Sequence, residues 1–221
     1  MAGVTLFESR TTNEDEKGKK RPSVVSGVVI NNCDLLKQGK VLVRIPSLGE
    51  EVWARVLSTA AGSNRGIMDI PQPDDEVLIG FAHDNPGDAF ILGSLWNNKD
   101  DMPADSPEEL LFKRIIQTGV GEFTGHRIEL DDARQSIIIT SSTKQKIEIL
   151  PEKIEISTTK GTAKITLNTT GNITIEAALS LTLKARQIKL DGTQVEITGQ
   201  VKTDVKSNGE CSINAPRVRI N

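Results

Sequence analysis

The sequence has few aromatic residues, and its last 98 positions have none. Phe, Trp and Tyr make up 3% of the 221 residues, Tyr is absent, and Phe123 is the last aromatic side chain. A β-helical enzyme that acts on polysaccharide needs aromatic platforms beside clustered acids, and this segment offers no such platform. Any core built after Phe123 must therefore consist of medium-sized aliphatic side chains.

Long apolar runs, a large charge imbalance and clustered cysteines are absent as well. The net charge of −3 gives no general basic field for nucleic acid or anionic membrane, and no segment reaches the apolar length of a membrane span. The first residues lack the apolar core of a signal peptide. Cys33 and Cys211 lie far apart in different kinds of sequence. We therefore expect two small, buried or neutral thiols, without a disulfide between them, in a protein made in a reducing cytoplasm.

Patterns that carry catalysis or metal binding were not found. The two histidines, His83 and His126, have no nearby cysteine or second histidine, and no nucleophile-elbow motif accompanies them. The run Gly119-Val120-Gly121 is too short to indicate a phosphate-binding loop. We therefore expect no enzyme activity, no catalytic residue, no metal site and no cofactor.

The first 22 residues are polar and densely charged. This composition favours a flexible, solvated arm. A second interpretation is that Val4, Leu6 and Phe7 dock on a hub or on a neighbouring subunit. The sequence leaves both interpretations open.

Residues 23–98 predict a small barrel. Short alternating segments are separated by turn-forming residues such as Gly39 and the run 71–75. The predicted strands are Val24–Ile30, Lys40–Ile45, Val52–Leu57, Glu76–Phe81 and Ala89–Leu95. Five strands in about 75 residues without a helical segment are typical of an OB-fold domain.

Residues 99–124 are interpreted as a connector. Ser106-Pro107-Glu108-Glu109 resembles a helix start, with a capping hydroxyl, a proline at the first helical position and acids in the first turn. We expect one or two helical turns from Glu108 to Phe112.

From residue 125 to 221 the pattern becomes a repeat. Apolar residues recur in pairs at i and i+2, and up to Val195 the first members of successive pairs are 7, 11, 8, 8, 7 and 7 residues apart. The pairs are Ile147/Ile149, Ile154/Ile156, Ile165/Leu167, Ile173/Ile175, Leu181/Leu183, Ile188/Leu190, Val195/Ile197 and Val218/Ile220. A repeat of this length indicates a solenoid or fibre in which each unit is one strand and one corner.

One chain is too short to build a stable solenoid from this repeat, because it would give only about four coils with unpaired edges. Three chains wound together would pair those edges and bring the apolar pairs onto a common axis. The predicted fold is therefore all-β: an N-terminal OB-fold barrel followed by a C-terminal intertwined trimeric β-helix, or β-prism, at 125–221. A β-sandwich is the competing account, although its hairpins would require more Asn-Gly, Asp-Gly and Pro signals.

The barrel segment strongly resembles a known domain. The motifs VWARV, DDEVLIGF and FILGSLWN occur in this order within residues 52–97, and GHRIELDD follows at 125–132. Together they resemble the OB-fold domain shared by baseplate assembly protein V of contractile-tailed phages and the valine-glycine-repeat (Vgr) spikes of type VI secretion. The resemblance covers roughly residues 23–221. It implies a structural spike that pierces a target cell envelope.

The resemblance also implies partners and a place of assembly. We expect a homotrimer, built in the bacterial cytoplasm into the baseplate of a phage tail or tail-like particle, with a separate hub protein above the OB collar. A small conical tip resembling the Pro-Ala-Ala-Arg-repeat (PAAR) proteins would dock on Arg217, Val218, Arg219, Ile220 and Asn221. The connector leaves no space for a lysozyme domain, and no His-x-His metal tip follows His126. The alternative is an OB-fold module on a β-helical stalk that binds nucleic acid or carbohydrate. An excess of 19 acidic over 13 basic residues in 1–123 argues against nucleic acid.

Overall fold

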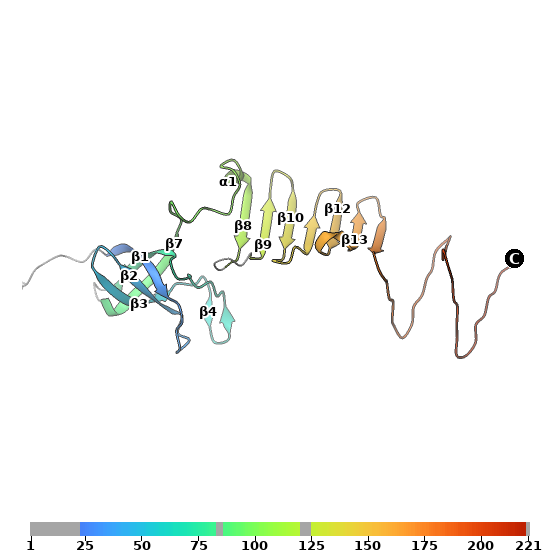
Figure 1. The fold of residues 1–221 in the computed structure, drawn as a ribbon, viewed down its shortest axis with the longest axis horizontal. Helices are drawn as coiled ribbons and strands as arrows, with labels where there is room; N and C mark the ends of the chain where they lie inside the picture. Colours follow the sequence, from blue (N-terminus) through green and yellow to red (C-terminus); the bar gives the residue numbers. More distant parts are fainter. Residues whose placement is uncertain (1–22, 83–85, 120–124, 220–221) are drawn as a thin grey trace, which may run out of the picture. The chain divides into compact units, whose positions relative to one another are not determined.

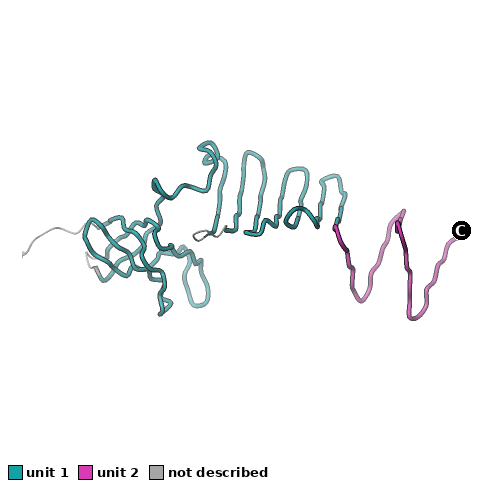
Figure 2. Tube along the Cα trace, viewed as in Figure 1, with its two compact units in different colours: residues 1–176 teal, residues 177–221 magenta. Residues whose placement is uncertain are grey.

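The computed structural model describes residues 23–82, 86–119 and 125–219. The predicted arm at 1–22, His83, Ile220 and Asn221 lie outside the described residues. The chain divides into two units, residues 1–176 and 177–221 (Figure 2). The described elements of the chain are β1 (Val24–Asn31), β2 (Lys40–Ile45), β3 (Glu50–Val56), β4 (Ala61–Gly62), β5 (Arg65–Gly66), β6 (Glu76–Phe81), η2 (Pro86–Asp88), β7 (Ala89–Leu95), α1 (Glu109–Phe112), β8 (Lys113–Gln117), β9 (Arg127–Asp131), β10 (Ser136–Thr140), β11 (Lys146–Ile149), β12 (Lys153–Ser157), η3 (Thr159–Gly161), β13 (Ala163–Asn168) and β14 (Ile173–Ala177).

The first part of the chain is a closed five-stranded barrel (Figure 1). Its strand order is β1-β2-β3-β7-β6, and β6 returns to pair with β1. All pairs are antiparallel except β3 with β7. Three predicted strands have the predicted bounds, and the other two differ by one or two residues at their ends. The prediction of an OB-type barrel is therefore confirmed.

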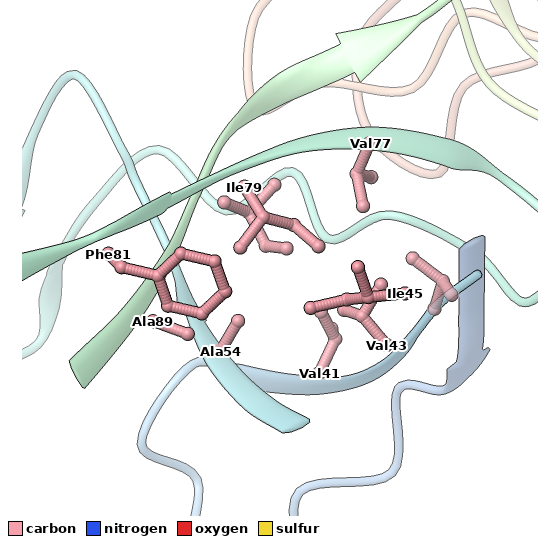
Figure 3. Close-up of a cluster of buried hydrophobic side chains, with 10 residues drawn as sticks. Val41, Val43, Ile45, Ala54, Val77, Ile79, Phe81 and Ala89 are labelled. Atoms are coloured by element: carbon pink, nitrogen blue, oxygen red, sulfur yellow. The ribbon is translucent and has the colours of Figure 1, made fainter. Parts of the chain in front are cut away.

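The barrel core consists of the inward-facing side chains of its strands, which alternate along each strand with outward-facing ones. Val41, Val43 and Ile45 of β2 are fully buried, as are Val77 and Ile79 of β6. Figure 3 shows these side chains pointing toward one another inside the barrel. Full burial of one such side chain is worth about 1.5–3 kcal/mol relative to exposure, so this cluster supplies the main stability of the barrel.

Gly27 marks the tightest point of strand β1. A Cβ atom at this position would lie 2.7 Å from Cδ1 of Ile79 and 2.8 Å from Cγ1 of Val43. It would also lie 2.9 Å from the backbone oxygen of Arg44. The barrel therefore closes over this strand only because residue 27 has no side chain.

The loop between β1 and β2 is organised by one carboxylate. Asp34 accepts hydrogen bonds from the backbone N–H groups of Leu36 at 3.0 Å, Gln38 at 2.6 Å and Lys40 at 3.2 Å. Desolvation opposes the charge of Asp34, but these donors hold the pKa of its carboxyl below the usual value. The loop thus has a defined backbone conformation although most of its side chains are exposed.

The second part is a seven-stranded sheet in which β8 to β14 follow one another as antiparallel neighbours (Figure 1). Four predicted apolar pairs lie on its last four strands, β11 to β14. Strand β8 lies within the segment interpreted as a connector, and it pairs with β9. The sheet therefore begins twelve residues before Gly125.

The pairing of these strands differs from the prediction. We expected every strand from residue 125 onward to find its neighbours in other chains, but up to Ala177 the strands pair within the chain. The turns that make this possible contain Gln135, Lys144 and Lys160, with φ values of 51°, 68° and 65°. Because these turns place ordinary residues in the left-handed region, they lack the usual Asn-Gly and Asp-Gly signals.

Helix α1 forms at the predicted place with a different start. It spans Glu109–Phe112, and no side chain caps its N-terminus. The backbone oxygen of Ser106, rather than the predicted hydroxyl, accepts the N–H of Glu109 at 3.2 Å. The helix is short because its last residue leads directly into β8.

The second unit has no strand within the described residues 178–219, and every side chain there is exposed. The predicted strands around Leu181, Ile188 and Val195 are thus not formed by the chain on its own. These residues keep the period-2 apolar pattern of a strand.

Candidate assembly surface

From β9 to β13, one face of the seven-stranded sheet consists of aliphatic side chains in two rows, which continue on β8 as Ile116 and Arg114. Partners that lie directly opposite each other in an antiparallel pair share a face. The first row is Ile116, Ile128, Ile139, Ile147, Ile156 and Ile165, and the second is Leu130, Ile137, Ile149, Ile154 and Leu167. We name these eleven residues the aliphatic face.

The aliphatic face is not covered by any other part of the described chain. Its ten residues on β9 to β13 are 36% to 45% exposed, and Ile116 on the edge strand β8 is 64% exposed. Their burial comes from neighbours in the same layer rather than from a second layer. A contiguous apolar surface of this kind marks a contact with another apolar surface.

The opposite face carries a row of carboxylates held by basic side chains. Lys113 contacts Glu129 at 3.1 Å, Lys146 contacts Glu148 at 2.7 Å, and Lys153 contacts Glu155 at 2.9 Å. Glu148 and Glu155 lie directly opposite each other. The lysine two residues before each of these glutamates therefore offsets a like-charge pair that would otherwise destabilise the sheet.

Two of these ion pairs shift the pKa values of the side chains that form them. Hydrogen bonding to Lys153 lowers the pKa of Glu155, and the same contact raises the pKa of Lys153. Burial works against the charge of Glu129, yet hydrogen bonds from Arg127 and Lys113 hold its pKa below the usual value. The carboxyls of Glu129 and Glu155 are therefore ionised at neutral pH.

The glutamates of the charged face are more buried than the residues of the aliphatic face. The side chains of Glu129, Glu148 and Glu155 are only 12%, 19% and 15% exposed, less than any residue of the aliphatic face. In a complete soluble fold the apolar face is the more buried one. The single chain thus exposes a surface that a further layer must cover.

A small network joins α1 and the connector to the start of the sheet. Lys113 contacts Glu109 of α1 at 2.7 Å as well as Glu129, and these partners raise its pKa. Arg127 contacts Glu129 at 2.9 Å and donates to the backbone oxygen of Pro103 at 3.0 Å. The network fixes the chain where it enters the sheet.

The structure brings together part of the predicted trimer core. Six predicted residues lie on the aliphatic face, from Ile147 to Leu167, and Ile173 and Ile175 follow on β14. Ile137 and Ile139 were missed, because Ile138 between them hides the alternation. Ile116 was missed because β8 begins before residue 125. Ile128 and Leu130 flank Glu129 in the same i and i+2 pattern, so the sequence could have identified them.

The remaining predicted residues lie in the second unit. Leu181, Leu183, Ile188, Leu190, Val195, Ile197 and Val218 are 52% to 72% exposed. Of the predicted tip-docking residues, Arg217, Val218 and Arg219 are exposed, and the last two residues lie outside the described part of the chain. The structure does not bring these residues together.

Within the described residues, no group of three or more His, Cys, Asp and Glu side chains could hold a metal ion. No helix in the described ranges is long and apolar enough to cross a membrane.

Comparison with known proteins shows which family of domains the barrel resembles. Residues 25–96 match the family described as the type VI secretion system/phage-baseplate injector OB domain. The barrel is therefore similar to an injector OB domain. Its match covers β1 to β7, and the sheet and the second unit lie outside it.

Spike proteins of type VI secretion resemble the chain over a longer stretch. The type VI secretion system spike protein VgrG5 of Pseudomonas aeruginosa is 28% identical over 116 residues, which cover 49% of this chain and 15% of that protein. VgrG1b of the same organism is 28% identical over 102 residues, which cover 44% of this chain and 14% of that protein. The chain is thus Vgr-like, and it matches less than a sixth of the length of these relatives.

Proposed function

We propose that the protein is the central spike of a contractile, phage-tail-like injection device and that it acts as a homotrimer. The observation that carries the proposal is the aliphatic face, joined in one chain to an injector OB domain. Three copies that turn these faces toward a common axis would bury them together and leave the charged faces in water. The spike acts mechanically, by piercing the target envelope, rather than as an enzyme.

The trimer accounts for the second unit as well. Residues 178–219 carry apolar side chains in strand alternation, and Leu179 and Val201 are each 99% exposed. Exposed backbone in such a segment is a template for pairing with other chains. Winding three copies of this segment around one axis would pair the backbone groups and bury the apolar side chains, as in the predicted β-prism.

We further propose two protein partners and a place of assembly. A hub protein would sit above a collar of three injector OB domains, and a conical PAAR-like protein would dock on the region of Arg217 to Asn221. The device would be assembled in the bacterial cytoplasm before it is fired. Co-purification of a candidate tip protein with the full chain, and with an Arg217→Glu/Arg219→Glu variant, tests the docking region. Unchanged capture by the variant would place the contact elsewhere.

Sedimentation equilibrium of the full chain tests the proposed function directly. We expect a mass three times the 24.0 kDa of one chain, independent of dilution through the micromolar range. A stable folded monomer would overturn the proposal, because a monomer would leave the aliphatic face in water.

A further inference from the structure

The two halves of the repeat differ in how regularly their apolar pairs are spaced. In the sheet, the first members Ile147, Ile154, Ile165 and Ile173 are 7, 11 and 8 residues apart. In the second unit, Leu181, Ile188 and Val195 are spaced evenly by 7 residues. The sheet is therefore irregular, whereas residues 181–197 of the segment after it are self-similar.

Self-similar strands have a weakly specified register. If one chain slid by one repeat along another, Leu181 would take the level of Ile188, and a similar apolar pair would again face the axis. Such a slip would keep most of the buried area while leaving one repeat unpaired at an end. The sequence of the second unit alone thus does little to align three chains.

The sheet lacks this ambiguity. Its strands are joined by turns of different lengths with fixed conformations, including Lys144, Lys160 and Gly171 at positive φ. Turn hydrogen bonds such as Thr158 N–H to the oxygen of Ala163, at 3.0 Å, hold the strand register within one chain. Each residue of the aliphatic face therefore has one defined position along the direction in which the strands follow one another.

We propose that the sheet β8–β14 acts as a register clamp for residues 178–219. On the trimeric arrangement proposed above, three sheets would join first through their aliphatic faces. That contact would bring the three chains past Ala177 at the same level, and the second unit would then pair from Ala177 onward. The inference rests on the proposed trimer and adds an order of assembly to it.

The order follows from the range of the contacts. Hairpins close within a few residues and form in microseconds, so β8–β14 can fold before any encounter between chains. Residues 178–219 form no strand within the described part of the chain, so the pairing of this segment must wait for other chains. If the three sheets have already joined, pairing between the chains in residues 178–219 can start at Ala177 and proceed strand by strand toward the C-terminus.

Pulsed hydrogen exchange during refolding of the full chain tests the order. We expect backbone amides within residues 127–168 to gain protection at earlier labelling times than amides within residues 181–205. Simultaneous protection, or earlier protection of residues 181–205, would overturn the proposal. The experiment uses the unsubstituted chain and therefore does not depend on whether a variant folds.

Spin labels on the natural Cys211, in a Cys33→Ser background, test the register itself. Both cysteines are free and exposed. Three aligned chains give one narrow distance between the labels. Ile147→Ser/Ile156→Ser, which weakens the clamp, should broaden the distribution, whereas the matched Ile188→Ser/Leu190→Ser change in the second unit should leave one distance. A single narrow distance in a clamp variant that is still trimeric would overturn the proposal.

The outcomes separate this inference from the proposed function. A monomeric unsubstituted chain, with no dipolar coupling between labels, would overturn the trimer itself. A trimer in which residues 181–205 become protected first would overturn only the clamp. If the clamp variant fails to assemble, the order of protection in the unsubstituted chain decides the case.

Discussion

Ile147 on β11 lies directly opposite Ile156 on β12, and these two side chains are 38% and 45% exposed in the single chain. Opposed side chains in an antiparallel pair contact each other, so the exposure that remains is the surface that points away from the sheet. That surface is available for burial on assembly. The first prediction concerns this pair.

Replacing Ile147 with Asp should abolish the proposed trimer. The change would place three carboxylates near one axis, and desolvating them costs several kcal/mol per trimer. Sedimentation velocity should show a shift from trimer to smaller species. The control is Glu148→Gln on the same strand, which alters the charged face and should leave the mass unchanged. A trimer that survives Ile147→Asp would show that the aliphatic face is not the interface.

Replacing Gly27 with Ala should destabilise the barrel by about 1–3 kcal/mol, because the new methyl group would overlap Ile79, Val43 and the backbone at Arg44. The matched control is Gly93→Ala on β7, where an added Cβ meets nothing within 4 Å. Urea denaturation followed by tryptophan fluorescence checks both variants. Equal stability of the two would mean that the barrel yields at β1 more easily than its packing suggests.

Replacing Asp34 with Ala should loosen the β1–β2 loop without unfolding the barrel. The amides of Leu36, Gln38 and Lys40 would lose their shared acceptor and exchange hydrogen faster, while amides of the fully buried β2 core would not. Asp34→Asn keeps a side-chain oxygen and should show a smaller effect. Hydrogen exchange measured by NMR resolves these amides individually.

Acidification should weaken the start of the sheet. Burial opposes the charge of Glu129, but Arg127 and Lys113 depress the pKa of this carboxyl in the folded state. A depressed carboxyl pKa contributes stability above the unfolded value of 4.5 and loses it as pH falls through the folded value. Stability should therefore decline from about pH 4.5 downward, and Glu129→Gln should show a smaller decline. Urea titrations at neutral pH and about pH 3 measure the difference; equal declines would contradict the assignment.

The sequence predicted the barrel closely because its strands alternate and its loops contain recognisable turn residues. Val41, Val43 and Ile45 alternate with polar or half-exposed residues, so the inward face of β2 could be read directly. The same alternation placed Ile147 and Ile149 on one face of the later sheet.

The hairpins of the sheet could not be predicted in the same way. Gln135, Lys144 and Lys160 adopt the left-handed conformation, which only the surrounding strand pairs impose on such residues. The run Ile137-Ile138-Ile139 carries no alternation, although Ile138 lies on the charged face between Glu129 and Glu148. Local sequence therefore showed which residues are apolar there but not which face each occupies.

The serial arrangement of β8 to β14 has a consequence for how such a protein can change in length. One hairpin is the smallest insertion that restores both the direction of the chain and the face of every later residue. Duplication of a hairpin would lengthen the sheet by two strand spacings, about 9.6 Å, and would leave existing contacts intact. Loss of a single strand would reverse the chain instead. The length of the sheet can therefore change only in whole hairpins, by about 9.6 Å at a time.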